Sequence, residues 1–392
     1  MTREEILNTA LQLHSNNICL EMATGTGKTL VALSIVKERL KDKLVKSILI
    51  VIPKNVLEKE WLKEIHKWEM DELIPFITFS TYVSFPKHNI NDFDAVIYDE
   101  AQHITDRCIE AIPSVNTPIN VLLSATIKRA HKMKLNRTFY NLHTLKVDIK
   151  DAVDNGILPD PTVLLIPLRL DKTKPKEVYI KRKSCKKTVV CEYKNRWQYL
   201  KDKTMQVQIW CTEYEYYEML ESDFVQATNH CRETWKRQLA IQRLKWLSKI
   251  KTDTTKRILE ILKDERTLTF CNSIEQCEEL GDYPIHSGKK ELLENLEKFN
   301  SGEINHITSV RMLDEGMNAV DLRIGVYGNI NASDIITKQR AGRILRHRNP
   351  IIIIPFYQGT REEEIVEKIK SDFNPDKIHT INYLNQIKDY LK

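Results

Sequence analysis

The chain has 392 residues, of which 42% are hydrophobic and 29% are charged, and its formal net charge is +6. This balance predicts two or three globular domains with buried cores; because no apolar run approaches the roughly 20 residues that span a bilayer and no basic leader opens the chain, we expect a soluble, cytoplasmic protein. The eight cysteines show no regular framework, which excludes a disulfide scaffold, and Cys185 and Cys191 lack partners at zinc-site spacing.

The first part of the chain alternates short apolar runs with helical patterns. The runs are rich in Ile, Val and Leu and occupy residues 46–53, 76–82, 94–100 and 120–126. Because continuous apolar strands alternating with helices form parallel sheets covered on both faces, we expect one strand–helix lobe over residues 1–150.

The segment TGTGKT, residues 24–29, lies between an apolar run and a helical pattern. Glycines let backbone N–H groups approach phosphate oxygens, and the start of the helix adds favourable polarity. We predict a triphosphate site formed by Gly25, Thr26, Gly27, Lys28 and Thr29. Lys28 would reach the β and γ phosphates and Thr29 would bind Mg²⁺, although the full pattern has glycine where this chain has Met22.

Two acids follow the apolar run of AVIYDEAQ, residues 95–102. The carboxyl ends of parallel strands are where ligands bind in open α/β sheets. Asp99 is predicted to hold Mg²⁺, and Glu100 to orient and deprotonate an attacking water. The alternative is that both acids only cap the next helix. A water-activating acid without an evident acceptor pocket favours hydrolysis over transfer.

Positive charge is concentrated between residues 171 and 250, which hold 18 basic and 10 acidic residues, so the rest of the chain sums to −2. Aromatic residues are interleaved with the densest basic part, residues 176–203. Basic and aromatic side chains together suit phosphate contacts and base stacking, so we predict contact with nucleic acid; the alternative is a solvated surface insertion. The predicted contact residues are Lys181, Arg182, Lys183, Lys186 and Lys187.

A second series of apolar runs follows Pro159 and Pro161, which mark the boundary between lobes. These runs occupy residues 162–170, 266–271, 306–312, 321–327 and 349–356. We expect a second parallel-sheet lobe over residues 151–392, with the basic and helical segment 171–263 inserted in it. Residues 361–372 predict a helix with a solvated acidic face, and the tail after it a terminal helix.

The order of short motifs along the chain resembles that of superfamily 2 helicases and translocases. The motifs run between residues 18 and 348 as MATGTGKT, IVIPKNVLEKEW, TFSTY, YDEAQ, LSAT, LTFCNSIEQCEEL, SVRMLDEGMNAV and QRAGRILR. The resemblance implies an α/β fold of two RecA-like parallel-sheet lobes with a basic insertion in the second lobe. It also implies ATP and Mg²⁺ as cofactors.

The last motif supplies the residues that would complete the site from the second lobe. Gln339, Arg343 and Arg346 recur at the spacing of one helix face. The resemblance makes all three catalytic, with Arg343 and Arg346 as arginine fingers that reach the γ-phosphate. The alternative is a salt-bridging helix face.

Other motif residues take roles from the same resemblance. Asp314 and Gly316 would bind the nucleotide. Ser124 and Thr126 would couple hydrolysis to movement of the lobes. Backbone phosphates of nucleic acid would be held by Thr81, Ser273 and Thr308, although such residues are also common helix caps.

The resemblance implies an ATP-dependent DNA helicase or duplex DNA translocase that unwinds or remodels paired or branched strands. DEAQ in place of DEAD, and Asn318, favour DNA over RNA and a likeness to phage recombination helicases and restriction-enzyme motors. Two alternative functions stay open. One is an RNA helicase, and the other is a non-unwinding nucleic-acid-stimulated ATPase that is the motor subunit of a larger assembly. We expect a monomer without a membrane partner, and replication, recombination or repair proteins are candidate partners.

Overall fold

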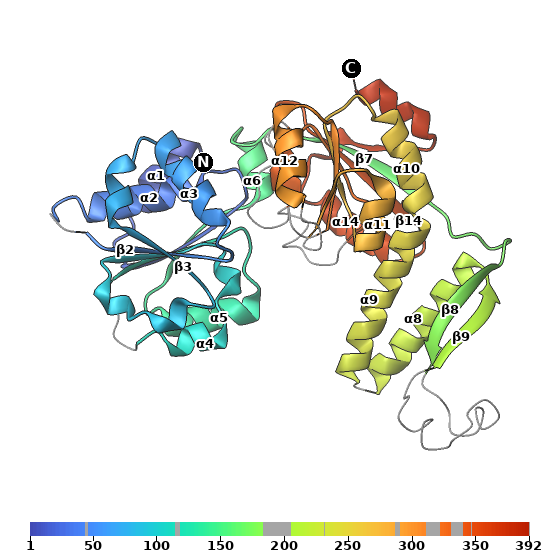
Figure 1. Ribbon diagram of the computed structural model, residues 1–392, viewed down its shortest axis with the longest axis horizontal. Helices are drawn as coiled ribbons and strands as arrows, with labels where there is room; N and C mark the ends of the chain where they lie inside the picture. Colours follow the sequence, from blue (N-terminus) through green and yellow to red (C-terminus); the bar gives the residue numbers. More distant parts are fainter. Residues whose placement is uncertain are drawn as a thin grey trace.

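The computed structural model describes residues 1–43, 46–113, 118–182, 205–230, 232–286, 291–310, 322–330, 340–345 and 347–391. Two α/β lobes lie side by side, and an arm extends from the second lobe (Figure 1). Each lobe is built on a parallel sheet, so the predicted fold class is confirmed. In the described ranges, no helix is both long and apolar enough to cross a membrane.

The first lobe has a six-stranded sheet in the order β3-β2-β4-β5-β1-β6. Its strands are β1 (Asn17–Met22), β2 (Ile48–Ile52), β3 (Ile77–Thr81), β4 (Ala95–Tyr98), β5 (Ile119–Ser124) and β6 (His143–Val147). All the paired strands are parallel. Strands β1, β2 and β4 are buried along their whole length, which explains their continuous apolar runs.

Helices cover both faces of this sheet because successive strand residues point to opposite sides. The helices are α1 (Arg3–Leu11), α2 (Lys28–Arg39), α3 (Leu57–Lys67), α4 (Asp106–Glu110), α5 (Arg129–Thr138) and α6 (Ile149–Asp154). Ile18 and Leu20 pack in the core with α1, α2 and α3, while Cys19 between them packs in the core with α4 and α5. Figure 1 shows these two groups of helices above and below the sheet.

The second lobe has a seven-stranded sheet in the order β11-β12-β10-β13-β14-β7-β15. Its strands are β7 (Thr162–Leu168), β10 (Thr267–Phe270), β11 (Pro284–Ile285), β12 (His306–Ser309), β13 (Ile324–Val326), β14 (Ile351–Tyr357) and β15 (Ile378–Thr380). Its helices include α10 (Thr252–Ile261), α11 (Ile274–Leu280), α12 (Leu292–Ser301) and α14 (Arg361–Lys370).

Two details at the end of the chain differ from the prediction. The predicted terminal helix packs on the second lobe, but it is a short 3-10 helix at Leu384–Tyr390, and it follows β15, a strand that was not predicted and that adds to the sheet beside β7. The buried Ile381 and Ile387 hold this tail on the lobe. Helix α14 does not expose all its acids, because Glu362 is only 1% exposed.

The arm consists of β8 (Lys176–Arg182), β9 (Met205–Cys211), α8 (Glu213–Asn229) and α9 (Glu233–Ile250). The two strands form an antiparallel ribbon. Tyr216 of α8 and Trp246 of α9 stack edge to face, with ring centroids 4.5 Å apart, and Leu220 and Leu239 lie in the same small core. Helix α10, in contrast, packs Ile258 into the core of the second lobe.

Candidate nucleotide site

The phosphate loop follows β1, and its two glycines adopt backbone angles that other residues rarely take. Gly25 has φ 89° and Gly27 has φ 96°, so the chain can turn sharply into α2. No side chain caps the start of α2, which leaves the N–H groups of its first turn available to an anion. The Thr26 hydroxyl donates to the Ala23 carbonyl over 2.7 Å and is buried, so Thr26 shapes the loop.

Asp99 lies at the carboxyl end of β4 and is held by contacts from two other segments. The Trp61 indole N–H donates to its carboxylate over 2.9 Å, and the Tyr82 hydroxyl donates to its backbone carbonyl over 2.7 Å. Burial, followed by the negative charge of Glu100, raises the pKa of Asp99 to about 6; the Trp61 hydrogen bond and the charge of Lys28 oppose this rise. The Lys28 charge therefore acts on the same carboxylate that was predicted to bind Mg²⁺.

Glu100 has a left-handed backbone conformation, with φ 51°, which is uncommon for a residue other than glycine. Its carboxylate accepts a hydrogen bond from the Gln102 amide nitrogen at 2.8 Å. The Gln102 amide oxygen accepts in turn from the Ser124 hydroxyl at 2.6 Å. The backbone N–H of Thr126 donates to the same Ser124 oxygen over 3.2 Å. Hydrogen bonds thus connect the acid after β4 to the end of β5.

The helical segment 340–345 of the second lobe lies against the phosphate loop of the first. A Cβ atom added to Gly342 would be 2.6 Å from the Thr24 Cβ and 3.0 Å from the Thr24 carbonyl oxygen, so only glycine permits this approach. Arg343 follows directly and is 6% exposed. Arg343 is thus a buried residue next to the glycine that contacts the phosphate loop. Four other predicted site residues, Gln339, Arg346, Asp314 and Gly316, lie outside the described residues.

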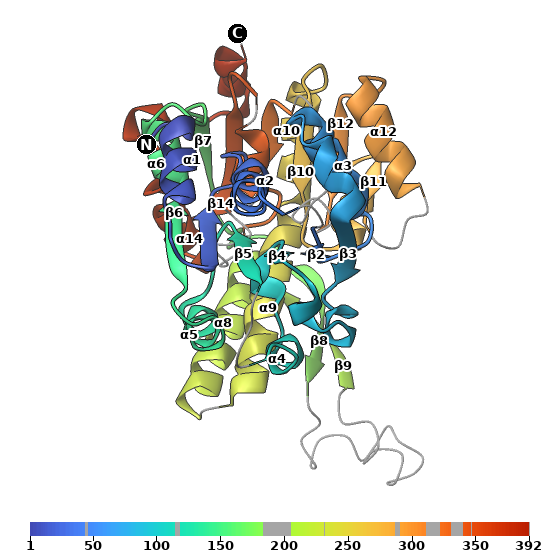
Figure 2. The same cartoon turned by 90° about the vertical axis from the view of Figure 1, so that its left-hand side faces the viewer.

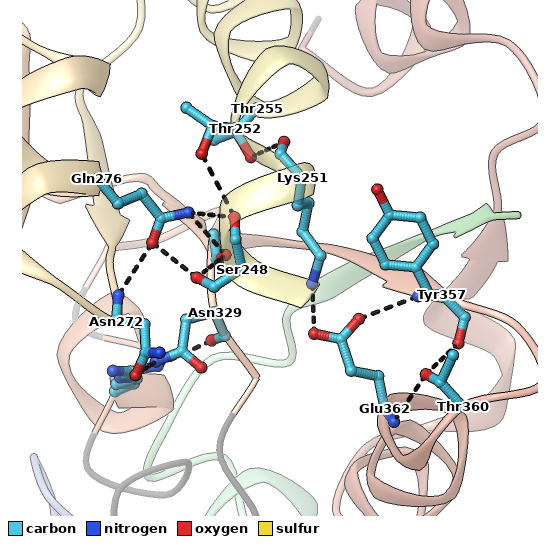
Figure 3. A network of polar contacts seen from close by, with 12 residues as sticks. Ser248, Lys251, Thr252, Thr255, Asn272, Gln276, Asn329, Tyr357, Thr360 and Glu362 are labelled. Atoms are coloured by element: carbon cyan, nitrogen blue, oxygen red, sulfur yellow. Dashed lines mark hydrogen bonds and ion pairs between the residues drawn. The ribbon is translucent and has the colours of Figure 1, made fainter. Parts of the chain in front are cut away.

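A chain of polar contacts leads from this segment to the arm. The Arg340 guanidinium donates to the Asn329 carbonyl over 3.0 Å, and the Asn329 amide donates to the Asn272 side chain over 3.3 Å. Gln276 accepts from the Asn272 N–H at 3.0 Å and from the Ser248 hydroxyl of α9 at 2.7 Å. Figure 3 shows Gln276 between the two, at the start of α11 and the base of α9.

The residues predicted to hold nucleic acid are in different settings. Thr81 is partly exposed at the end of β3, and its oxygen accepts from the Ser84 N–H at 3.3 Å. Ser273 is partly exposed and caps α11 by accepting from the Gln276 N–H. Thr308 is fully buried and donates to the Cys277 carbonyl over 2.8 Å, so the prediction that it faces nucleic acid is wrong for this structure.

The predicted basic contacts lie at or beyond the limit of the described residues. Lys181 and Arg182 occupy backbone positions on β8, paired in register with Gln206 and Met205 of β9. Lys183, Lys186 and Lys187 lie outside the described residues. Of the five predicted contacts, the structure therefore shows the strand positions of Lys181 and Arg182 in the arm.

The residues present suit a nucleotide with its metal. The N–H groups at the start of α2 and the Lys28 ammonium suit phosphate, and the Thr29 hydroxyl and the Asp99 carboxylate are oxygen ligands of the kind Mg²⁺ prefers. In the described parts of the chain, no three His, Cys, Asp or Glu side chains cluster as a metal site. A magnesium ion here would therefore take its other ligands from phosphate and water.

Sequence reasoning missed three residues that support this site. Trp61 stands four residues from the buried Leu57 and Ile65, so its position on α3 predicts only a core residue. Tyr82 next to Thr81 carried no separate signal. Gln102 was visible as the last letter of DEAQ, but it counted only as a departure from the family pattern.

Comparison with known proteins supports a helicase assignment for both halves. Residues 3–129 match the family model "Type III restriction enzyme, res subunit", and residues 250–348 match "Helicase conserved C-terminal domain". No curated protein matches the chain in sequence.

Several solved structures share the two-lobed fold. S. cerevisiae Dbp5 bound to RNA and ADP BeF3 is 12% identical with a TM-score of 0.64, over 100% of this chain and 93% of that one. The Pyrococcus furiosus Hef helicase domain is 14% identical with a TM-score of 0.51, over 94% and 97% of the two chains. The Type ISP restriction-modification enzyme LlaBIII bound to DNA is 15% identical with a TM-score of 0.55, and the match spans 32% of that longer chain.

Each half of the chain matches a family model, and the two lobes meet at a phosphate loop. Together these observations define the class of the protein as an ATP-dependent nucleic-acid motor of the helicase type. Within that class, the chain belongs to the superfamily 2 DEAD/DEAH-like helicases. The family predicted from the order of the motifs is thereby confirmed.

Proposed function

We propose that this protein is an ATP-dependent DNA helicase or duplex DNA translocase that unwinds or remodels paired or branched strands. The observation that supports the proposal is the approach of Gly342 to Thr24, since Arg343 is the next residue after Gly342 and Thr24 belongs to the loop that contains Lys28. A nucleotide at that loop would touch both lobes. Its binding would therefore favour closure and its hydrolysis would favour opening.

Each residue has a distinct task in this proposal. Lys28 and the N–H groups of α2 neutralise the phosphate charge. Glu100 orients a water molecule and takes its proton, and Gln102 holds the Glu100 carboxylate. Arg343 stabilises the charge that develops on the γ-phosphate. Thr29 and Asp99 would hold a Mg²⁺ ion, which would offset the negative charge of the phosphates.

DNA is favoured as the substrate because the first half matches a restriction-enzyme family model and LlaBIII is described as bound to DNA. A likeness to phage recombination helicases belongs to the same hypothesis. RNA is the second candidate, since Dbp5, which is described as bound to RNA, shares the fold over the whole chain. A motor that moves on the duplex without separating its strands is equally consistent with these residues.

The first prediction is that DNA stimulates ATP hydrolysis. Phosphate release should be measured with single-stranded, duplex and forked DNA and with RNA, at one salt concentration. DNA should raise the rate more than RNA of matched length does. Lys28→Ala is the control and should abolish hydrolysis with every substrate. Stimulation by RNA alone would contradict the DNA assignment, and strand displacement on the forked substrate separates unwinding from translocation.

A further inference from the structure

Two helices, α5 of the first lobe and α9 of the arm, come from segments that are rich in Lys and Arg. Residues 111–147 contain six Lys and Arg and no Asp or Glu, and residues 234–250 contain five and none. The first segment supplies α5, and the second supplies α9 except for its first residue, Glu233, which pairs with Lys236. Residues 111–147 belong to the part of the chain outside residues 171–250, and the net charge of that part is −2. The positive charge of residues 111–147 does not show in this sum, because acidic residues elsewhere in the same part outweigh it.

Helix α5 and the residue before it expose cations to solvent. Lys128, Arg129 and Arg137 are exposed, and no acidic side chain within the described ranges is seen to pair with them. The inner side of the helix is occupied differently, since Leu135 is buried and Lys132 pairs with Glu21 at 2.7 Å. Arg129 and Arg137 therefore lie on the outer side of α5, and Lys128 lies at its N-terminal end.

Helix α9 exposes a cationic stripe on the side away from α8. Arg237, Ile241, Lys245 and Lys249 are all exposed and recur every four residues, so they share one face about 18 Å long. The opposite face packs on α8 through buried residues: Leu239 lies in the shared core, and the Arg243 guanidinium is 3.8 Å from the Phe224 ring. Among the described residues, none forms an ion pair with the three cations of the stripe.

The figures agree on the relative positions of the two helices. In Figure 1, α9 is the layer of the arm nearest the first lobe, with α8 and the ribbon β8–β9 beyond it, and α5 is at the lower edge of the first lobe. Figure 2, seen from the side of the first lobe, shows α5 at the height of α8 and α9. The face of α9 opposite α8 is thus directed toward the lobe that carries α5.

The base of α9 is fixed in the second lobe, so its stripe moves with that lobe. Ser248 bonds Gln276, and Lys251, which follows α9 directly, is fully buried with its ammonium 2.6 Å from Glu362 (Figure 3). Helix α5 is attached to the first lobe. Movement between the lobes therefore changes the spacing of the two cationic faces.

We propose that two cationic faces hold the phosphate backbone of a nucleic acid between the first lobe and the arm. The face on the first lobe consists of Lys128, Arg129 and Arg137, and the face on the arm consists of Arg237, Lys245 and Lys249. A polyanion is the occupant because every charge on both faces has one sign and neither segment contains an acid. This inference rests on the proposed function. It adds contacts that are separate from the basic segment of the ribbon.

Two triple variants test the proposal. The first combines Lys128→Gln, Arg129→Gln and Arg137→Gln. The second combines Arg237→Gln, Lys245→Gln and Lys249→Gln. The matched control combines Lys37→Gln, Lys41→Gln and Lys43→Gln, and it lowers the net charge by the same amount. These lysines lie in the last turn of α2 and just after it, and each is paired with an acid. Anisotropy of a labelled duplex, measured from about 50 to 200 mM salt, gives the dissociation constant and its salt dependence.

Each triple variant should bind more weakly at low salt, and the slope of log affinity against log salt should fall by roughly 2 to 3, since each duplex phosphate contact contributes about 0.9. The control should retain the wild-type slope, and basal hydrolysis should be unchanged in all three. Equal slopes in the control and both variants would overturn the inference while leaving the proposed function intact. If no nucleic acid stimulates the wild-type protein, the proposed function itself fails.

Discussion

Gln102 connects the acid that would activate water with the neighbouring strand. Its amide nitrogen donates to Glu100 while its amide oxygen accepts from Ser124. A side-chain amide can do both at once, whereas leucine can do neither and an ionised carboxylate only accepts. The left-handed backbone of Glu100 makes this support more important, because an unfavourable conformation persists only where surrounding contacts hold it.

Replacing Gln102 should therefore lower turnover without preventing nucleotide binding. Gln102→Leu keeps a side chain of similar size but frees the Glu100 carboxylate, and a misplaced catalytic group costs roughly 10- to 100-fold in rate. We expect a decrease of that order in DNA-stimulated kcat, with the affinity for a labelled ATP analogue unchanged. Ser124→Ala, which removes only the outer hydrogen bond, should have a smaller effect. A kcat equal to that of the wild type would show that Gln102 does not position Glu100.

At the scale of elements, one buried ion pair joins the base of α9 to the end of β14 and the start of α14. Glu362 accepts from the Lys251 ammonium at 2.6 Å and from the Tyr357 N–H at 3.0 Å, while Thr360 caps α14 (Figure 3). Burial lowers the pKa of Lys251, and the charge of Glu362 opposes this shift. The pair explains why α14 buries an acid that its sequence pattern assigns to solvent.

Removing only the lysine should destabilise the second lobe strongly. Lys251→Met leaves Glu362 charged and unpaired in the interior, which costs about 3–5 kcal/mol in the free energy of unfolding. The double variant Lys251→Met with Glu362→Gln keeps an acceptor for the Tyr357 N–H and should regain most of this loss. Urea denaturation of the full chain measures both. A double variant no more stable than the single one would contradict the role of the pair.

For the whole molecule, the decisive contact is that between Gly342 and Thr24, because it joins the two lobes at the nucleotide loop. The Thr24 Cβ and the Thr24 backbone limit the space, so even one methyl group must push segment 340–345 away from the loop. Arg343 would retreat with it. The close approach of this segment to the loop therefore requires that residue 342 has no side chain.

Gly342→Ala should consequently impair hydrolysis in the same way as the loss of the finger. Arg343→Ala is expected to lower kcat by about 10³-fold, and Gly342→Ala by roughly 10²-fold because it displaces the same group. The double variant should be no slower than Arg343→Ala, since both changes remove one interaction. Additive losses in single-turnover hydrolysis would mean that the glycine and the arginine act independently.

Much of the fold and part of the candidate site were predictable from local patterns. The apolar runs that became β1, β2, β4, β5, β7, β10, β13 and β14 are continuous because their strands are buried on both faces. The short β15 was missed because three residues carry little periodic signal. Thr308 was misjudged since a threonine at the end of a strand looks the same whether its hydroxyl faces solvent or, as here, a neighbouring carbonyl.

Most of the elements, the residue types of the loops after β1 and β4, and the helicase family could be read from the chain before folding, because each depends on residues that are near one another in the sequence. The contact of Gly342 with Thr24, the bridge of Gln102 between Glu100 and Ser124, and the buried pair of Lys251 and Glu362 became known from the folded chain, as did the position of α9 as the layer of the arm nearest the first lobe. Packing selects these contacts, and it joins residues whose separation in the chain carries no pattern.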